Sequence, residues 1–106
     1  MDKYFIEHKL KNNEYDLSSH AHNERQNEQI TIKEIEQSLL HGDIIETYPG
    51  DPRGESCLVA FGNQGKSLHV ICGIRSDRLL VVTVYRHKSP VWTDYKTRAK
   101  ELKSRV

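Results

Sequence analysis

The chain has 106 residues, of which 36% are hydrophobic and 29% are charged, and its formal net charge is +1. These values are typical of a single small globular domain with one core. No apolar run is long enough to span a bilayer, and the polar start at Met1-Asp2-Lys3-Tyr4 does not resemble a signal peptide, so we expect a cytoplasmic protein. The two cysteines, Cys57 and Cys72, stand in apolar strand-like runs and are interpreted as buried thiols.

The charge is unevenly distributed along the chain. Up to Tyr85 there are 9 Lys or Arg against 13 Asp or Glu, whereas from Arg86 onward there are 7 against 2. Clustered cations attract phosphate groups whatever the total charge of the protein. The C-terminal basic residues could thus form a phosphate-binding surface. The alternative is a solvated helix face, and the charge pattern alone favours this alternative.

Three helices are predicted in the N-terminal half. Residues 4–10 fit a short amphipathic helix, and also a strand. Residues 19–28 fit a polar helix that Ser18 or Ser19 caps, although it offers almost no apolar side chain for burial. The third helix starts with a capping box of Thr31 and Glu34 and ends at Gly42. Its staple and buried stripe comprise Ile30, Ile32, Ile35 and Leu39.

Four strands are expected after these helices, at residues 44–48, 57–61, 68–74 and 79–85. A terminal helix is expected from residue 93, with a stripe formed by Tyr95, Ala99, Leu102 and Val106. The predicted fold is therefore α+β, with an antiparallel four-stranded sheet, two to three N-terminal helices packed on one face, and a C-terminal helix. All of it belongs to a single domain, residues 1–106.

The two-residue period of the strands assigns side chains to faces. We expect one face of the sheet to pack against the helices. The side chains expected to point toward the helices are those of Leu68, Val70, Leu80, Val82 and Val84. The opposite face then presents His69, Thr83 and Tyr85 together in a concave sheet. The polar helix with His20 and Arg25 is expected to close that concavity.

Several spaced motifs resemble one known family. They are Ser19-His20-Ala21 with Arg25, Ile30-Thr31 opening a helix, residues 42–48, Leu68-His69-Val70, Thr83-Val84-Tyr85-Arg86, and Trp92 followed by Arg98. In this order they resemble the domain-of-unknown-function 4258 family, which is grouped with RelE- and ParE-like toxins. One departure is His87-Lys88, where the family commonly has proline and aspartate.

The resemblance implies a RelE-like α+β fold and a messenger-RNA-cleaving toxin that pairs with a small antitoxin, often a zinc-finger protein. It carries over site positions at His20, Arg25, His69, Thr83, Tyr85, Trp92 and Arg98. The expected partner is thus RNA, either free or on the ribosome. Binding to a membrane is not expected.

Metal-independent RNA cleavage requires a base for the 2′-hydroxyl proton, an acid for the leaving 5′-oxygen, and cations that hold the phosphate. Histidine suits both proton transfers because its unperturbed pKa is roughly 6.5. We therefore expect His69 and His20 to be the acid–base pair in either order, and Tyr85 to orient the substrate or stack on a base. Phosphate or substrate contacts are expected from Arg25, Thr83, Arg86, Trp92 and Arg98.

Other interpretations stay open at this stage. His69 fits a packed core histidine, Trp92 a core plug, and Arg25 a structural ion pair. The six histidines lack zinc spacing, and His20 and His22 point to different sides of a helix, so neither a metal nor a cofactor is expected. The protein also fits a non-catalytic RNA- or protein-binding module, or a gyrase-directed toxin of the ParE kind.

Overall fold

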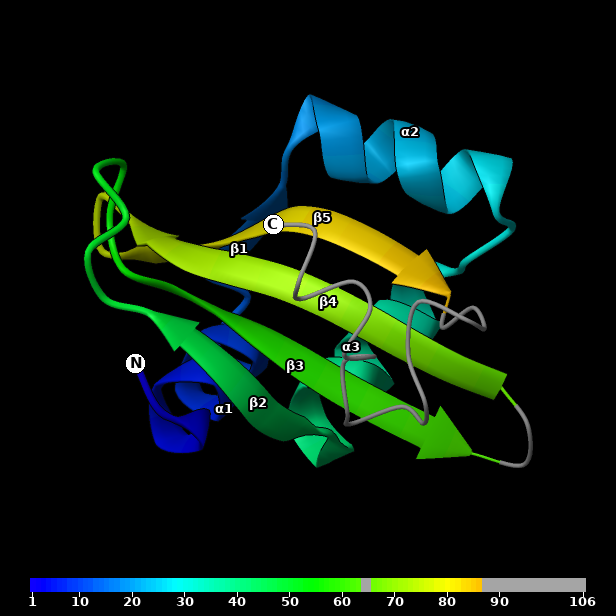
Figure 1. The fold of residues 1–106 in the computed structure, drawn as a ribbon, viewed down its shortest axis with the longest axis horizontal. Coiled ribbons are helices and arrows are strands. Elements are labelled where there is room, and N and C mark those ends of the chain that lie inside the picture. The colour runs from blue at the N-terminus through cyan, green and yellow to red at the C-terminus, as the bar shows by residue number, and fades with distance from the viewer. Residues whose placement is uncertain (64–65, 87–106) are drawn as a thin grey trace, which may run out of the picture.

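A computed structural model describes residues 1–63 and 66–86, which form three helices and a five-stranded sheet (Figure 1). In chain order the elements are α1 (Lys3–Lys11), β1 (Tyr15–Leu17), α2 (Ser19–Asn27), α3 (Ile32–His41), β2 (Asp43–Tyr48), β3 (Ser56–Asn63), β4 (Lys66–Arg75) and β5 (Arg78–Arg86). The strands lie side by side in the order β1-β5-β4-β3-β2.

The expected antiparallel four-stranded sheet is wrong in its strand number and in its directions. Strands β2 to β5 pair antiparallel as expected, but β1 adds a fifth strand that runs parallel to β5, with Tyr15 opposite Leu79. The three helices of the described part precede β2, and the C-terminal helix expected from residue 93 lies outside the described residues. The fold is thus α+β with a mixed sheet.

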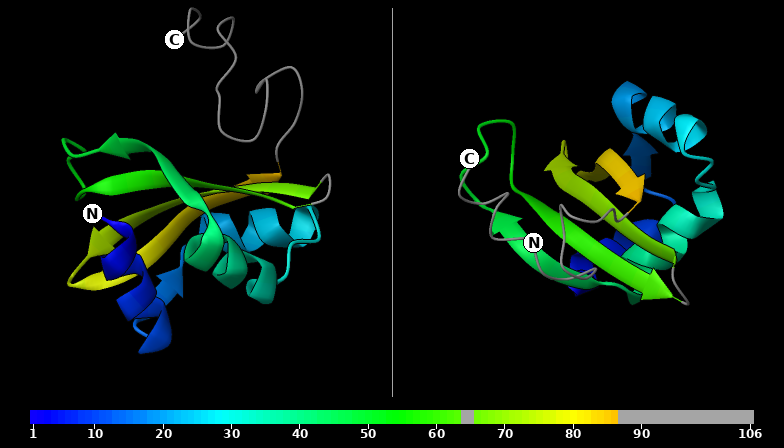
Figure 2. Two further views of the ribbon diagram at one scale, coloured as in Figure 1. Left: turned by 90° about the horizontal axis from the view of Figure 1, so that it is seen from below. Right: turned by 45° about the vertical axis from the view of Figure 1, so that its right-hand side comes forward.

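The helices lie on one side of the sheet (Figure 2, left), as expected. The core between them and the sheet consists of fully or almost fully buried side chains. Those from the helices and the loop before α3 are Ile6, Ala21, Ile30, Ile35 and Leu39, and those from the strands are Cys57, Val59, Leu68, Val70, Cys72, Leu79, Val81 and Val84.

A β-bulge changes which β5 side chains face the helices. The register between β4 and β5 shifts between Ile71 and Cys72, which oppose Thr83 and Val81. An extra residue in one strand moves the side chains on one side of the bulge to the other face. Leu79 and Val81 therefore belong to the helix-side core, and the expectation that Leu80 and Val82 point there is wrong.

Local signals explain where α3 begins and ends. Thr31 accepts a hydrogen bond from the Glu34 N–H at 3.0 Å, and the Glu34 carboxylate accepts one from the Thr31 N–H at 3.0 Å, so the capping box is confirmed. Gly42 is the C-cap, as expected. A Cβ at Gly42 would lie 2.5 Å from the Ser38 carbonyl oxygen and 2.6 Å from that of Ala60, so only glycine fits between α3 and β3.

Candidate functional site

His69 and Tyr85 lie on the face of the sheet that points away from the described helices α1 to α3. They are directly paired residues of β4 and β5, and their rings meet edge to face with centroids 5.2 Å apart and an angle of 89°. Thr83 lies on the same face, opposite Ile71. The expectation that His69, Thr83 and Tyr85 share a face is confirmed. His69 is fully buried, whereas Thr83 and Tyr85 are partly buried.

The polar helix α2 does not close this face. It runs along β5 on the side of the sheet where α3 also lies (Figures 1 and 2). The His20 side chain is 65% exposed, and its Nε2 lies 3.2 Å from the Glu24 carboxylate in the next helical turn. Arg25 donates from Nη1 to the Ile30 carbonyl at 3.3 Å. The structure therefore does not bring His20 or Arg25 together with His69.

Helix α2 instead satisfies the open edge of β5. The Val84 N–H donates to the Glu24 carboxylate, and the Arg86 N–H donates to the Glu28 carboxylate, both at 3.2 Å. Residues four apart on a helix are separated by about 6 Å along its axis, and residues two apart on a strand by about 6.6 Å, so the two spacings match. Ser18 is the N-cap of α2 and donates its hydroxyl to the Val82 carbonyl at 2.9 Å.

This arrangement explains a helix with only one buried residue, Ala21. Strand β1 covers the edge of β5 only from Leu79 to Val81, and the rest would present unpaired backbone groups. Carboxylates that accept backbone N–H groups form charge-assisted hydrogen bonds, which are stronger than neutral ones. The polar composition of α2 therefore has a structural role.

Arg86 is bound to α3 and to the segment before it. Its guanidinium donates two hydrogen bonds to Glu34, at 3.0 and 3.2 Å, and one to the Gln29 carbonyl at 3.2 Å. The hydrogen bonds from Arg86 are the main reason that the pKa of Glu34 lies below its ordinary value. The residue expected to contact phosphate thus joins the end of β5 to the start of α3.

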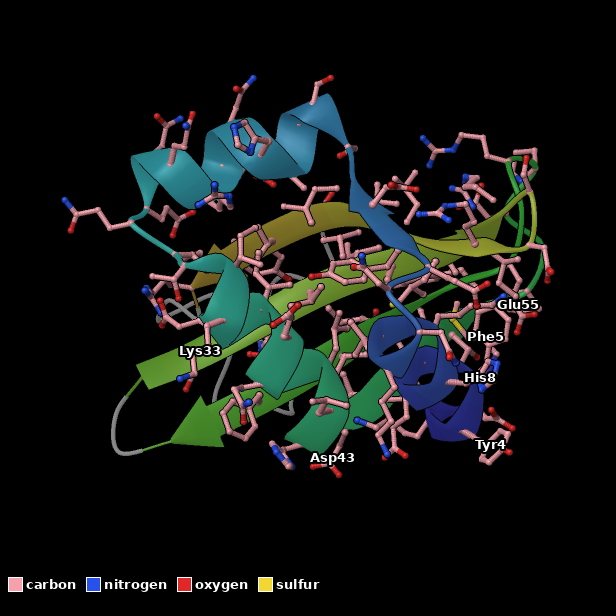
Figure 3. The ribbon with its side chains drawn as sticks, turned by 180° about the vertical axis from the view of Figure 1, so that it is seen from behind. Tyr4, Phe5, His8, Lys33, Asp43 and Glu55 are labelled. Atoms are coloured by element: carbon pink, nitrogen blue, oxygen red, sulfur yellow. The ribbon has the colours of Figure 1, made fainter. Side chains whose placement is uncertain are left out.

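A cavity of about 290 Å³ lies beside this ion pair on the helix side of the sheet. Phe61 and Leu68 contribute its apolar wall, and Lys33, Glu34 and Arg86 its charged rim. Lys33 is at the N-terminal end of α3 (Figure 3). The cavity and the His69–Tyr85 pair are therefore on opposite faces, because Leu68 and His69 alternate along β4.

Two expected site residues, Trp92 and Arg98, lie outside the described residues. Within residues 1–63 and 66–86, no group of three or more His, Cys, Asp or Glu side chains is arranged to hold a metal ion. None of the helices in that part of the chain is long and apolar enough to cross a membrane.

Comparison with known families gives one match. The family model "Domain of unknown function (DUF4258)" matches residues 17–86, which is more than half of the chain. The protein is a member of the DUF4258 family. No curated protein and no solved structure matches the chain.

The segment that defines DUF4258 membership begins at the last residue of β1 and ends with β5. It includes α2, α3 and the four antiparallel strands, and it leaves α1 outside. The expected site positions at His20, Arg25, His69, Thr83, Tyr85 and Arg86 fall inside it. In the structure these positions lie in three separate places. His69, Thr83 and Tyr85 share one face of the sheet. His20 and Arg25 lie on α2 at the sheet edge, and Arg86 joins β5 to α3.

The sequence interpretation missed two groups. The carboxylates of Glu24 and Glu28 have the four-residue spacing that would have signalled a shared direction on α2, but no pattern showed that a strand edge lies beside them. The second group is the cysteine pair, whose Sγ atoms are 3.8 Å apart. The turn between the two expected strands fixes which residues of the hairpin face each other. Counting residues outward from that turn would have placed Cys57 opposite Cys72.

Proposed function

We propose that this DUF4258 protein is the toxin of a toxin–antitoxin pair and that it cleaves RNA without a metal ion. The observation that carries the proposal is the edge contact between the His69 imidazole and the Tyr85 ring, with Thr83 on the same face. The basic residues that follow β5 in the sequence supply charges for phosphate binding. The proposed partner besides RNA is a small antitoxin protein of the zinc-finger kind.

The proposed reaction needs only two proton-transfer groups. His69 accepts the proton of a ribose 2′-hydroxyl, whose oxygen attacks the adjacent phosphorus. Tyr85, whose phenol can donate its O–H, transfers that proton to the 5′-oxygen as the P–O5′ bond breaks. The products are a 2′,3′-cyclic phosphate and a 5′-hydroxyl. His20 has no role in this scheme, because it lies on α2.

The burial of His69 imposes a condition on the proposal. A fully buried imidazole cannot contact a ribose, so the surface around His69 and Tyr85 must open when RNA binds. The same burial supports a second candidate function, a non-catalytic RNA-binding module. In that case His69 packs against Tyr85 and holds its ring in position for a base to stack on.

Cleavage of RNA in the presence of EDTA separates the two functions. The substrates are a long mixed-sequence RNA and the same RNA in a cell-free translation reaction, so that free and ribosome-dependent cleavage are both sampled. His69→Ala and Tyr85→Phe test the two proton-transfer groups, and binding to RNA is measured for each variant by fluorescence anisotropy. His20→Ala is the matched control, since it removes a histidine from α2 at an exposed position.

The nuclease function predicts defined products ending in a cyclic phosphate, loss of cleavage by at least 100-fold in both site variants, and wild-type cleavage by His20→Ala. Retained RNA binding in the inactive variants would show that the site acts in the reaction. The binding-module hypothesis predicts a different pair of results. Both RNA substrates stay intact, and the wild-type protein binds RNA whereas Tyr85→Ala does not. These results would rule out the nuclease function.

A further inference from the structure

Cys57 and Cys72 are the only cysteines of the chain, and the structure places them directly opposite each other on β3 and β4. Both are fully buried and unbridged, and their Sγ atoms are 3.8 Å apart. Both side chains belong to the helix-side core, on the face away from His69.

The ladder position of the two cysteines sets how far their backbones must move to form a disulfide. The Ile74 N–H donates to the Glu55 carbonyl at 2.9 Å, so residues 55 and 74 form a hydrogen-bonded pair of the antiparallel ladder. Hydrogen-bonded pairs alternate with non-hydrogen-bonded ones, which makes Cys57 and Cys72 a hydrogen-bonded pair as well. Such pairs have Cα atoms about 5.5 Å apart, within the range that disulfides adopt. Their Cβ atoms are also about 5.5 Å apart, whereas a disulfide needs about 3.5–4.5 Å, so the two strands must move closer locally when the bond forms.

The surroundings of the pair favour a thiolate at one sulfur. The hydrogen bond with Cys72 lowers the pKa of the Cys57 thiol, and the positive charges of the Met1 amino group and of Lys3 add to the lowering. Burial and the Glu55 carboxylate oppose it. The pKa of the Cys72 thiol is raised by its hydrogen bond with Cys57 and by burial, and either sulfur can be the donor of that bond. The two directions favour Cys57 as the sulfur that loses its proton.

Contacts of the first residues fix these two cations. The Met1 amino group pairs with the Glu55 carboxylate, and the Lys3 ammonium donates to the carbonyls of Leu39 and Gly42. Figure 3 shows Glu55 near the helix α1 that carries Phe5. The Glu55 carboxylate offsets the charge of the Met1 amino group, whereas Lys3 adds a positive charge near the cysteine pair.

We propose that Cys57 and Cys72 are a redox-active thiol pair, which a peroxide that enters the core by local opening of the fold oxidises to a disulfide between β3 and β4. The Cys57 thiolate attacks a peroxide oxygen, the O–O bond breaks, and the leaving hydroxide takes up the proton that the Cys57 thiol has lost, which gives a sulfenic acid at Cys57 and one water. Cys72 then attacks this sulfur, and the hydroxyl group leaves with the Cys72 proton as water. Two thiols are oxidised by two electrons, and hydrogen peroxide is reduced to two waters. This inference does not depend on RNA cleavage.

The experiment treats the reduced, folded full-length protein with hydrogen peroxide. Thiols are counted after quenching and unfolding, and intact mass and non-reducing electrophoresis identify the product. We expect both thiols to disappear together, the mass to fall by two hydrogens, the chain to stay a monomer, and dithiothreitol to restore both thiols.

Single variants test the order of the two steps. In Cys72→Ser the sulfenic acid cannot be resolved, so a dimedone adduct should accumulate at Cys57. In Cys57→Ser the remaining thiol should react at least 10-fold more slowly. Lys3→Met should slow disulfide formation several-fold, whereas Lys11→Met, which removes an exposed lysine at the other end of α1, should leave the rate unchanged.

Three results would overturn the proposal. The first is two free thiols in the folded protein at a peroxide dose that oxidises the chain unfolded in guanidinium. The second is a product linked between chains. The third is a sulfinic or sulfonic acid without any intramolecular disulfide. Circular dichroism of each variant identifies a loss of fold, and the wild-type measurements decide the proposal even if a variant fails to fold.

Discussion

Helices α2 and α3 have 9 and 10 residues and lie on the same side of the sheet, but they are held by different forces. Helix α3 buries Ile35 and Leu39 fully against the strands, and burial of such side chains contributes about 1.5–3 kcal/mol each. Helix α2 buries only Ala21 and is fixed by carboxylates that accept the backbone N–H groups of β5.

The comparison shows that a helix can be part of a fold without an apolar stripe when it completes a sheet edge. The two modes of attachment respond to different perturbations. The hydrophobic contact of α3 depends on volume and shape, whereas the edge contact of α2 depends on charge and hydrogen-bond geometry.

The largest effect is expected from the α3 contact. Leu39→Ala should lower the free energy of unfolding by about 2–5 kcal/mol, because it removes buried methyl groups and leaves a cavity between α3 and the sheet. Urea denaturation followed by circular dichroism measures the change. The matched control is Leu40→Ala, the same substitution at the next, partly buried position of α3. An equal loss in both variants would contradict the assignment of Leu39 to the core.

A smaller and more local effect is expected from the α2 contact. Glu24→Ala should lower the free energy of unfolding by about 1–2 kcal/mol, because the Val84 N–H loses a charged acceptor. Hydrogen exchange measured by NMR should show faster exchange at Val84, and Glu28→Ala should show the same at Arg86.

The control for these variants is Gln26→Ala, an exposed position on α2 between the two carboxylates. It should leave both amides protected. If Glu24→Ala leaves the exchange of Val84 unchanged, then the amide is protected by burial, and the edge-capping role of α2 is wrong.

The contrast between the helices also explains how much of the fold was predictable. The capping box and apolar stripe of α3 are local signals, and they correctly predicted a helix from Thr31 to Gly42. The polar helix α2 was also predicted, but not its position, because hydrogen bonds to a strand edge require knowledge of which strand is at the edge. Strand β1 has three residues and no alternation long enough to detect.

The candidate site was predictable to the extent that strand alternation holds. His69 and Tyr85 were correctly placed on one face, since they lie on the same side of the bulge, toward the end of β5. Leu80 and Val82 were misplaced because an inserted bulge residue leaves no mark in the hydrophobic pattern. His20 was paired with His69 from the chemistry of histidine, from the family resemblance, and from the expectation that the polar helix closes the concave face. None of these reasons tells on which side of the sheet α2 lies.

The smallest effect concerns the ion pair at the α3 start, where both modes of attachment meet. Glu34→Gln should lower the free energy of unfolding by about 1 kcal/mol or less at pH 7, since the pair with Arg86 is partly exposed. The pKa of Glu34 is lower in the folded chain than its ordinary value, so its contribution is complete above the unfolded pKa, 4.5. It is lost as the pH falls from there through the folded pKa, because the folded carboxylate must then be protonated. The wild-type and Glu34→Gln denaturation curves should therefore differ at pH 7 and converge on acidification.

A double-mutant cycle with Arg86→Gln measures the pair itself. A coupling energy near zero in this cycle would assign the loss to the capping box with Thr31 and not to the charge of Arg86.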